Sequence, residues 1–174
     1  MGIDIGTTSI SGVLCAGEDR TVQATVAMPH DAEVPELPAD RHEQFPERIL
    51  LITREVIRSL AERAVSPISG IALTGQMHGI VIVDEELTPL TPCITWRDAR
   101  TSRHPTAVLQ HPYASETGCF LHPGYGSLTL HHLLRTGTLP KHAYKALSIP
   151  GFVAARLTGR CTTDETLAAG GLPS

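Results

Sequence analysis

Gly2-Ile3-Asp4-Ile5-Gly6-Thr7-Thr8-Ser9, at the start of the chain, is the most informative stretch of the sequence. Its apolar and β-branched residues predict two short strands, Gly2–Ile5 and Ser9–Cys15, around a tight turn at Gly6-Thr7-Thr8. In the next segment, Thr21–Ala27, apolar residues alternate with polar ones, which is the period of a half-buried strand. The chain is therefore predicted to open with an antiparallel β-meander.

The turn between the first two strands carries groups that suit a phosphate with its Mg²⁺. Backbone N–H groups of such a turn can form an anion-binding nest, and Gly6 allows a phosphate to approach closely. Thr7 and Thr8 add hydroxyl donors, and the carboxylate of Asp4 can hold the metal through its waters. A strand follows and the G-x-x-x-x-G-K-[ST] pattern is missing, so the turn is not a P-loop. The alternative is a surface hairpin in which Gly and Thr only satisfy turn geometry.

The clearest helix is predicted after a proline-rich loop, from Pro46 to about Val65. One face of it is apolar apart from Thr53, and consists of Ile49, Leu50, Val56, Ile57, Leu60, Ala61 and Ala64. The later elements predicted are strands at Ile68–Thr74, Ile80–Asp84 and Cys93–Trp96, and helices at Ser127–Thr136, Lys141–Leu147 and Phe152–Leu157. Gly137 and Gly159 stand where C-terminal helix caps are expected. Strands followed by mixed helices and strands predict an α/β domain on a mixed sheet.

Two further segments place polar residues where predicted strands end. In Thr74-Gly75-Gln76-Met77-His78-Gly79, two glycines around Gln and His make a loop that can press its backbone against a polyol and offer donors and acceptors. In Thr95-Trp96-Arg97-Asp98-Ala99-Arg100, an Asp and an Arg within reach of each other can hydrogen-bond to hydroxyls, with Trp96 beside them as an apolar wall. For the first segment, the alternative is a tight connection with a core Met and a solvated His. For the second segment, the alternative is a surface ion pair.

Composition excludes several classes of function. The 174 residues are 41% hydrophobic and 18% charged, so they can bury a core, and the net charge of -4 with 4% aromatic residues speaks against nucleic acid. No apolar run could span a bilayer, and the start of the chain lacks the features of a signal peptide. Four scattered cysteines are typical of reduced thiols, and the histidines show no metal-ligand spacing. These features predict a cytoplasmic protein without nucleic-acid or membrane partners.

Taken in order, these segments resemble the amino-terminal domain of the FGGY-type carbohydrate kinases, in the actin-like ATPase superfamily. The opening stretch resembles the family's first phosphate loop, and Glu43-Gln44-Phe45-Pro46-Glu47 is similar to its E-Q-x-P-E stretch. Gly75-Gln76-Met77-His78-Gly79 resembles the G-Q-M-H-G of the xylulokinase and sedoheptulokinase-like branches, and Trp96–Arg100 matches W-x-D-x-R. Smaller landmarks continue the match: Thr117-Gly118, Pro123-Gly124, Leu157-Thr158-Gly159 and Thr163-Asp164.

The resemblance implies a fold, a reaction and a set of site residues. The fold would be an α/β actin-like ATPase (ribonuclease H-like) domain with a mixed β-sheet and flanking helices. The reaction would be in-line transfer of the γ-phosphoryl group of ATP to a hydroxyl of a ketose such as xylulose. Asp4 would position the Mg²⁺ of ATP, and Gly6, Thr7 and Thr8 would meet its phosphates. Sugar contacts would come from Gln76, Met77, His78 and Asp98.

The resemblance also implies that residues 1–174 form a partial amino-terminal domain, without the family's C-terminal actin-like domain. The family's catalytic aspartate lies in a Gly-Gly-x-Asp segment that this chain does not reach, since the match ends at Gly170-Gly171-Leu172. Gly151 also replaces an Asp that many members carry before an aromatic residue. The chain alone is therefore expected to be inactive. A second chain or a homo-oligomer could complete the fold.

Three hypotheses follow for the function. The first is a portion of a pentulose or heptulose kinase, with the chemistry belonging to the full-length form. The second is a non-catalytic sugar-binding or interaction module derived from such a kinase, which would bind sugar without hydrolysing ATP. The third is a decaying fragment, which would fold poorly because part of the sheet would expose apolar surface.

Overall fold

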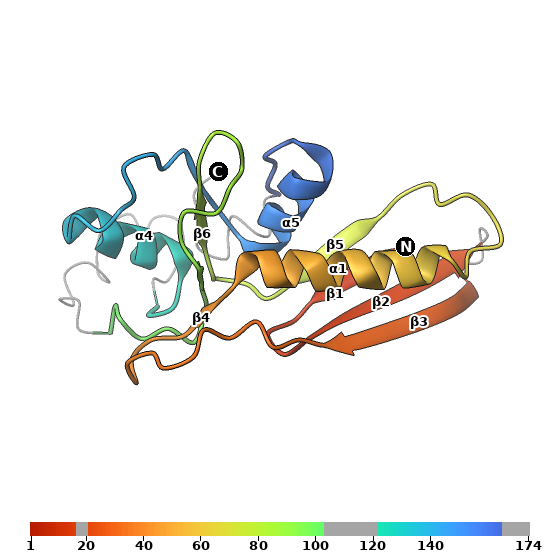
Figure 1. The fold of residues 1–174 in the computed structure, drawn as a ribbon, viewed down its shortest axis with the longest axis horizontal. Helices are drawn as coiled ribbons and strands as arrows, with labels where there is room; N and C mark the ends of the chain where they lie inside the picture. Colours follow the sequence, from red (N-terminus) through yellow and green to blue (C-terminus); the bar gives the residue numbers. More distant parts are fainter. Residues whose placement is uncertain (17–20, 103–121, 165–174) are drawn as a thin grey trace. The chain divides into compact units, whose positions relative to one another are not determined.

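A computed structural model describes residues 1–16, 21–102 and 122–164 of the chain (Figure 1). The chain divides into two compact units. Unit 1 consists of Met1–Ala32 and Glu47–Gln76, and unit 2 consists of Glu33–Pro46 and Met77–Ser174. Two of the segments named above, Thr117-Gly118 and Gly170-Gly171-Leu172, lie outside the described residues, as does one of the four cysteines, Cys119.

Unit 1 is built on a four-stranded sheet in the order β3-β2-β1-β5. The strands are β1 (Gly2–Ile5), β2 (Ser9–Ala16), β3 (Thr21–Pro29) and β5 (Ala72–Gly75). The pairs β1–β2 and β2–β3 are antiparallel, whereas β1 and β5 are parallel. The predicted meander and the mixed sheet are therefore confirmed. The strand predicted at Ile68–Thr74 is shorter, because regular pairing begins only at Ala72.

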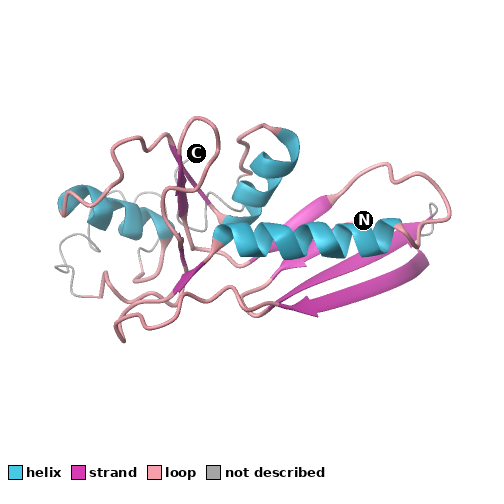
Figure 2. Ribbon diagram, viewed as in Figure 1, coloured by secondary structure: helices cyan, strands magenta, loops and turns pink. Residues whose placement is uncertain are grey.

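Helix α1 (Pro46–Ala61) covers one face of this sheet (Figures 1 and 2). A Cβ atom built on Gly12 of β2 would lie 2.6 Å from Leu60 Cδ1 and 2.8 Å from Val56 Cγ1, so helix and sheet are in close contact there. The predicted polar member of the helix face, Thr53, is fully buried and donates its hydroxyl hydrogen bond to the carbonyl of Ile49 at 2.8 Å. The buried helix face is thus satisfied internally.

The bounds and the buried face of α1 differ in detail from the prediction. The helix begins at Pro46 as expected, where the fixed φ of proline suits the first turn. It ends at Ala61 rather than near Val65, and Ala61 is itself exposed. Ile52, which the periodicity did not assign to the core, is 5% exposed and therefore buried.

Within residues 33–46, 77–102 and 122–164, which are the described part of unit 2, the strands form two short two-stranded sheets and the helices are α4 and α5 (Figure 2). Its elements are β4 (Glu43–Gln44), β6 (Val81–Val83), β7 (Cys93–Ile94), α4 (Gly126–Arg135), β8 (Lys145–Leu147) and α5 (Ile149–Thr158). β4 pairs with β7 and β6 pairs with β8, both antiparallel. Ile80, Ile82, Ile94 and Leu133 form a buried core cluster. Among the described residues, no helix is long and apolar enough to cross a membrane.

One predicted helix of unit 2 is wrong. Lys141–Leu147 was expected to be helical, yet Lys145–Leu147 is strand β8, paired residue by residue with Val83, Ile82 and Val81 of β6. Hydrogen bonding to a distant apolar strand outweighs a short helical pattern, because local preferences are weak beside tertiary pairing. The helices predicted around α4 and α5 are confirmed, and Gly137 and Gly159 follow their last turns with φ of 68° and 72°.

Candidate functional site

The turn between β1 and β2 is held by backbone bonds and by one histidine that the sequence analysis missed. The Gly6 N–H donates to the Ser9 carbonyl at 3.0 Å, and the His30 N–H donates to the Thr8 carbonyl at 3.0 Å. His30 Nε2 lies 3.1 Å from the Gly6 carbonyl oxygen, and its Nδ1 lies 3.4 Å from the Ala32 nitrogen. Because a carbonyl only accepts, the proton sits on Nε2 and Nδ1 accepts from Ala32. His30 thereby fixes the turn from the end of β3.

Asp4 lies on β1, on the sheet face that α1 does not cover. Its register partners are Ser11 on β2 and Thr74 on β5, so hydroxyl side chains flank it on the same face. Asp4 is exposed, and within the described part of the chain its carboxylate makes no hydrogen bond or ion pair. In the same described residues no cluster of three His, Cys, Asp or Glu side chains could hold a metal. A single exposed carboxylate fits Mg²⁺, which keeps several waters and binds through one or two carboxylates plus substrate phosphates.

The loop after β5 begins with a glycine that the packing requires. A Cβ atom on Gly75 would lie 2.5 Å from the Ile5 carbonyl oxygen, so only glycine fits beside β1 here. The next backbone N–H, of Gln76, donates to the same carbonyl at 2.8 Å. Gln76 is 8% exposed, whereas Met77 is 42% exposed. The division between the two units falls between Gln76 and Met77.

His78 is the chemically distinctive residue of this loop in unit 2. Its φ of 71° is in the left-handed region, which costs a non-glycine residue about 1–3 kcal/mol unless its surroundings enforce it. Its half-buried imidazole stacks on the ring of Tyr125, with the ring centroids 4.0 Å apart and the planes 3° from parallel. Just after it, Ile80 and Ile94 exchange two backbone hydrogen bonds of 2.9 Å. The loop is therefore anchored to β7.

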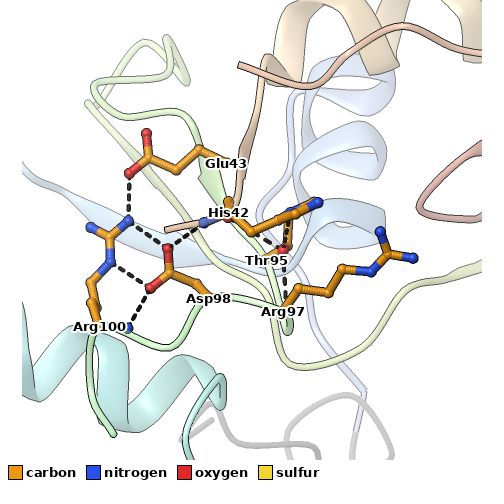
Figure 3. A network of polar contacts seen from close by, with 6 residues as sticks. All are labelled: His42, Glu43, Thr95, Arg97, Asp98 and Arg100. Atoms are coloured by element: carbon orange, nitrogen blue, oxygen red, sulfur yellow. Dashed lines mark hydrogen bonds and ion pairs between the residues drawn. The ribbon is translucent and has the colours of Figure 1, made fainter. Parts of the chain in front are cut away.

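The Trp96–Arg100 segment carries a buried network of charges (Figure 3). Both oxygens of Asp98 accept hydrogen bonds from the Arg100 side chain: Nε donates to Oδ1 at 2.7 Å and Nη2 donates to Oδ2 at 2.8 Å. The backbone N–H of Arg100 adds a bond to Oδ1 at 3.0 Å, and that of His42 adds one to Oδ2 at 2.9 Å. Arg100 Nη2 also pairs with Glu43 Oε1. The network joins two segments more than fifty residues apart.

Burial of this network makes one sequence alternative wrong. The sequence left open that Asp98 belongs to a surface ion pair, but Asp98 is 2% exposed and the side chain of Arg100 is 6% exposed. The charges tolerate burial because each is paired and hydrogen-bonded. Burial favours the neutral form of Asp98, yet the bonds from Arg100 and from two backbone N–H groups outweigh it and hold the carboxyl pKa below its usual value. Burial opposes the charge of Arg100 as well, but Asp98 and Glu43 raise its pKa.

A second polar chain runs from the same segment to His42. Thr95 is fully buried, and its Oγ1 lies 2.7 Å from His42 Nδ1. The backbone N–H of Arg97 donates to this hydroxyl at 3.3 Å, and Thr95 N–H donates to the His42 carbonyl at 3.1 Å. His42 Nε2 lies 3.3 Å from Glu33 Oε1. These contacts fix the backbone on both sides of Trp96.

Trp96 itself is 47% exposed, and the Arg97 guanidinium carbon lies 5.3 Å from its ring centroid. A cation thus lies over the ring face. The role of Trp96 as an apolar wall beside a sugar stays a prediction.

The cysteines described in the structure are free thiols: Cys15, Cys93 and Cys161. Cys93 on β7 is fully buried, and burial together with the charge of Glu43 raises the pKa of its thiol to about 12. A thiol held in its neutral form is a poor nucleophile, so Cys93 acts as part of the core.

The structure distributes the predicted site residues over both units. Asp4, Gly6, Thr7, Thr8 and Gln76 belong to unit 1, and Met77, His78 and Asp98 belong to unit 2. Sequence reasoning did not predict three supporting residues, which are His30, His42 and Tyr125. It also did not predict that Glu43 pairs with Arg100. Of these, only Glu43 stood in a recognised motif.

Comparisons with known proteins agree with this geometry. A family model described as the FGGY family of carbohydrate kinases, N-terminal domain, matches residues 1–172. A xylulose kinase of Klebsiella pneumoniae is 29% identical over 98% of the chain and 35% of that protein. A gluconokinase of Bacillus subtilis is 32% identical over 71% of the chain and 24% of that protein.

A solved structure gives the same picture at the level of the fold. The crystal structure of a xyloylose kinase from Brucella ovis superposes with a TM-score of 0.86 at 28% identity, over 97% of this chain and 35% of the other. The chain therefore spans about a third of the length of the relatives that it matches.

Proposed function

The chain belongs to the FGGY family of carbohydrate kinases, and on that premise we propose that it supplies the first phosphate loop and sugar-facing residues of an ATP-dependent kinase. The reaction is transfer of the γ-phosphoryl group of ATP to a hydroxyl of a ketose such as xylulose. The family match over residues 1–172 carries the proposal. The hairpin turn beside an exposed carboxylate supports it, because this is what a Mg²⁺-phosphate ligand needs.

The phosphate side of the reaction is assigned to unit 1. Thr7 and Thr8 meet the phosphates of ATP with their hydroxyls, while Gly6, whose N–H closes the turn on Ser9, places no side chain in the way of a phosphate. The contacts of His30 keep this turn in place. Asp4 would hold the Mg²⁺ of ATP with its exposed carboxylate. When bound, the ion neutralises charge on the phosphates during transfer.

The sugar side is assigned to Gln76, Met77 and His78, with Trp96 as a neighbouring apolar surface. An imidazole can donate from one nitrogen and accept at the other, which suits two hydroxyls of one sugar. Direct contact of Asp98 with the sugar, which the resemblance implies, stays a prediction. The contacts of Asp98 support a positioning role, because Arg100 and His42 already bond to both of its oxygens.

The remaining machinery is proposed to lie outside these residues. Transfer to a hydroxyl requires a base, which family members carry in a Gly-Gly-x-Asp segment that the 174 residues do not contain. The chain by itself is then expected to bind ligands without turnover, with a further segment or a second chain supplying the base. A cytoplasmic location belongs to the same proposal and is supported by the free thiols.

Calorimetric titration of the 174-residue chain with D-xylulose and with D-gluconate tests the sugar assignment. We expect D-xylulose to bind, and His78→Ala to weaken binding at least tenfold. His142→Ala is the matched control, since His142 is an exposed histidine of the same unit. Equal binding by the wild type and His78→Ala would contradict the assignment of His78. Tighter binding of D-gluconate than of D-xylulose would move the substrate from a ketose to a sugar acid.

The phosphate assignment has its own test. Titration with ATP at rising Mg²⁺ concentration should show Mg²⁺-dependent binding that Asp4→Asn weakens. Asp40→Asn, which changes an exposed carboxylate of unit 2, should leave binding as in the wild type. ATP affinity that ignores both Mg²⁺ and Asp4 would contradict the role given to this carboxylate.

The alternative is a non-catalytic sugar-binding module. A chain that binds sugar but shows no phosphoryl transfer even when a segment carrying the base is added would point to this alternative. The relatives that match this chain include a xylulose kinase and a gluconokinase, and this favours the kinase proposal.

A further inference from the structure

The segment before α4 is a turn that aims one aromatic side chain. The Tyr125 N–H donates to the His122 carbonyl at 3.0 Å, which closes a four-residue turn with Pro123 and Gly124 at its centre. Gly124 has a φ of 89°. Proline at the second position and glycine with positive φ at the third are the features of a type II turn. The Pro123-Gly124 landmark therefore has a local physical purpose, which is to set the direction of Tyr125 at the start of α4.

The same glycine anchors the turn to the segment after β7. A Cβ atom on Gly124 would lie 2.2 Å from the Trp96 carbonyl oxygen and 3.0 Å from its carbonyl carbon. No side chain fits at that distance, so the turn rests directly on the backbone of Trp96. That backbone is fixed in turn by the bonds of Thr95 with His42. Tyr125 is thus placed by contacts with a rigid part of unit 2.

The ring of Tyr125 meets His78 almost face to face. The centroids lie 4.0 Å apart and the planes differ by 3°. His122 approaches the same tyrosine ring at 5.9 Å with a 45° tilt. His78 has a left-handed backbone, so its side chain leaves the loop in a direction that an ordinary turn would not give. Stacking against a fixed ring restricts rotation of the imidazole about its side-chain bonds.

We propose that Tyr125 is a positioning residue for His78: its ring, aimed by the 122–125 turn, holds the imidazole by one face and fixes the orientation in which the imidazole meets the sugar. This rests on the proposed function, which gives His78 its sugar contact. The effect acts through His78, so Tyr125 needs no contact with the substrate. The phenol hydroxyl is not required, because the plane of the ring does the positioning.

Proton NMR of the histidine rings of the full chain tests the stack directly. Protons above the face of an aromatic ring are shifted upfield, so the ring protons of His78 should resonate upfield of those of exposed His142 and show cross-relaxation with the ring of Tyr125. The His78 signals are assigned by their disappearance in His78→Gln. Tyr125→Leu should move them to the position of an exposed histidine, and Tyr125→Phe should keep them upfield.

Titration of the same variants with D-xylulose measures their affinity for the sugar as a second test. Tyr125→Leu is expected to lose about three- to tenfold in affinity, the range that one aromatic contact accounts for. Tyr125→Phe should restore wild-type affinity. Tyr144→Leu is the matched control, since Tyr144 is 52% exposed and contacts the ammonium of Lys145 rather than a histidine.

The outcomes separate the two proposals. A wild-type chain without upfield His78 signals and without cross-relaxation to Tyr125 overturns the positioning role even if Tyr125→Leu does not fold. Weakened sugar binding in His78→Gln with unchanged binding in a folded Tyr125→Leu overturns it as well. If the wild type binds no sugar, the proposed function fails in this chain, and the NMR comparison of Tyr125→Leu with Tyr125→Phe still decides whether Tyr125 fixes the His78 ring.

Discussion

The β1–β2 turn of unit 1 and the charge network of unit 2 both position candidate site residues, but they are built in different ways. The turn closes through Gly6 and Ser9, three residues apart, and Asp4 beside it is exposed. The network joins Asp98 and Arg100 to His42 and Glu43, and its charges are nearly excluded from solvent. The turn is closed by a local backbone bond and held from outside by His30, whereas the buried network depends on every charged partner.

The ion pair of unit 1 gives the contrast a quantitative form. Arg48 Nε lies 2.8 Å from Asp31 Oδ1, close to the 2.7 Å between Arg100 and Asp98. The side chains of Arg48 and Asp31 are 43% and 77% exposed, however, so water competes for both groups. The two pairs therefore share a similar Nε–Oδ1 distance but differ in burial and in the number of hydrogen bonds to the carboxylate, so each can be compared with the other.

The largest expected effect comes from removing the central cation. Arg100→Ala leaves the carboxylates of Asp98 and Glu43 without their cation, and loss of one buried partner costs about 3–5 kcal/mol. Arg48→Ala should leave stability unchanged within error. Chemical denaturation followed by circular dichroism measures both. Equal destabilisation by the two changes would show that burial of the network is not what makes it matter.

The next effect concerns the turn beneath Tyr125. Gly124→Ala combines a positive φ with a clash against the Trp96 carbonyl, and we expect a loss of about 2–4 kcal/mol. Gly137→Ala has a similar φ of 68° but nothing within 4 Å of the added methyl group, so it should cost about 1 kcal/mol. Denaturation midpoints compare the two. If they coincide, backbone strain alone explains the need for Gly124, and its contact with Trp96 is unimportant.

A smaller effect is expected where the helix meets the sheet of unit 1. Gly12→Ala would press a methyl group against Leu60 and Val56, and overpacking of this kind costs about 1–3 kcal/mol. Gly70→Ala meets nothing within 4 Å and should be neutral. Thermal unfolding of both variants measures the difference, and a neutral Gly12→Ala would mean that α1 can move away from β2.

The smallest effect is a pH dependence. Although burial opposes it, the bonds from Arg100 and from two backbone N–H groups hold the pKa of Asp98 in the folded chain below its ordinary value, so the stabilisation is complete above that ordinary value and disappears as the pH falls through the folded pKa. Denaturant midpoints measured from pH 6 to pH 2.5 should fall at the acid end, and Asp98→Asn should flatten this decline. Asp31→Asn should flatten it less, because Asp31 is exposed. A stronger effect of Asp31→Asn would reverse the comparison between the two pairs.

The elements that sequence reasoning located are those that local chemistry determines. The β1–β2 hairpin, the start of α1 at Pro46 and the glycine after each of α4 and α5 follow from turn residues, a fixed φ and helix caps. The helix predicted at Lys141–Leu147 failed because β8 exists only through its pairing with β6, more than sixty residues earlier. No window of local sequence contains that information.

The candidate site divides along the same line. Asp4, Gly6 and the Gln76–His78 loop stand out by residue type and spacing, and family resemblance gave them roles. His30, His42 and Tyr125 could not be found in this way, because each acts through a contact made only after folding. The choice between a surface and a buried ion pair at Asp98 likewise depends on Glu43, 55 residues earlier in the chain, and on the burial of both groups.

One NMR titration tests the central proposal, which is that residues of unit 1 bind the phosphates of ATP and that His78 and its neighbours in unit 2 bind the sugar. Amide spectra of the 174-residue chain are recorded with D-xylulose alone and then with Mg²⁺ and a non-hydrolysable ATP analogue. We expect the sugar to shift signals around His78, Trp96 and Tyr125, and the nucleotide to shift those of Gly6–Ser9 and His30. The account would be contradicted if neither ligand shifted its group of signals. It would also be contradicted if the sugar shifted only signals of unit 1.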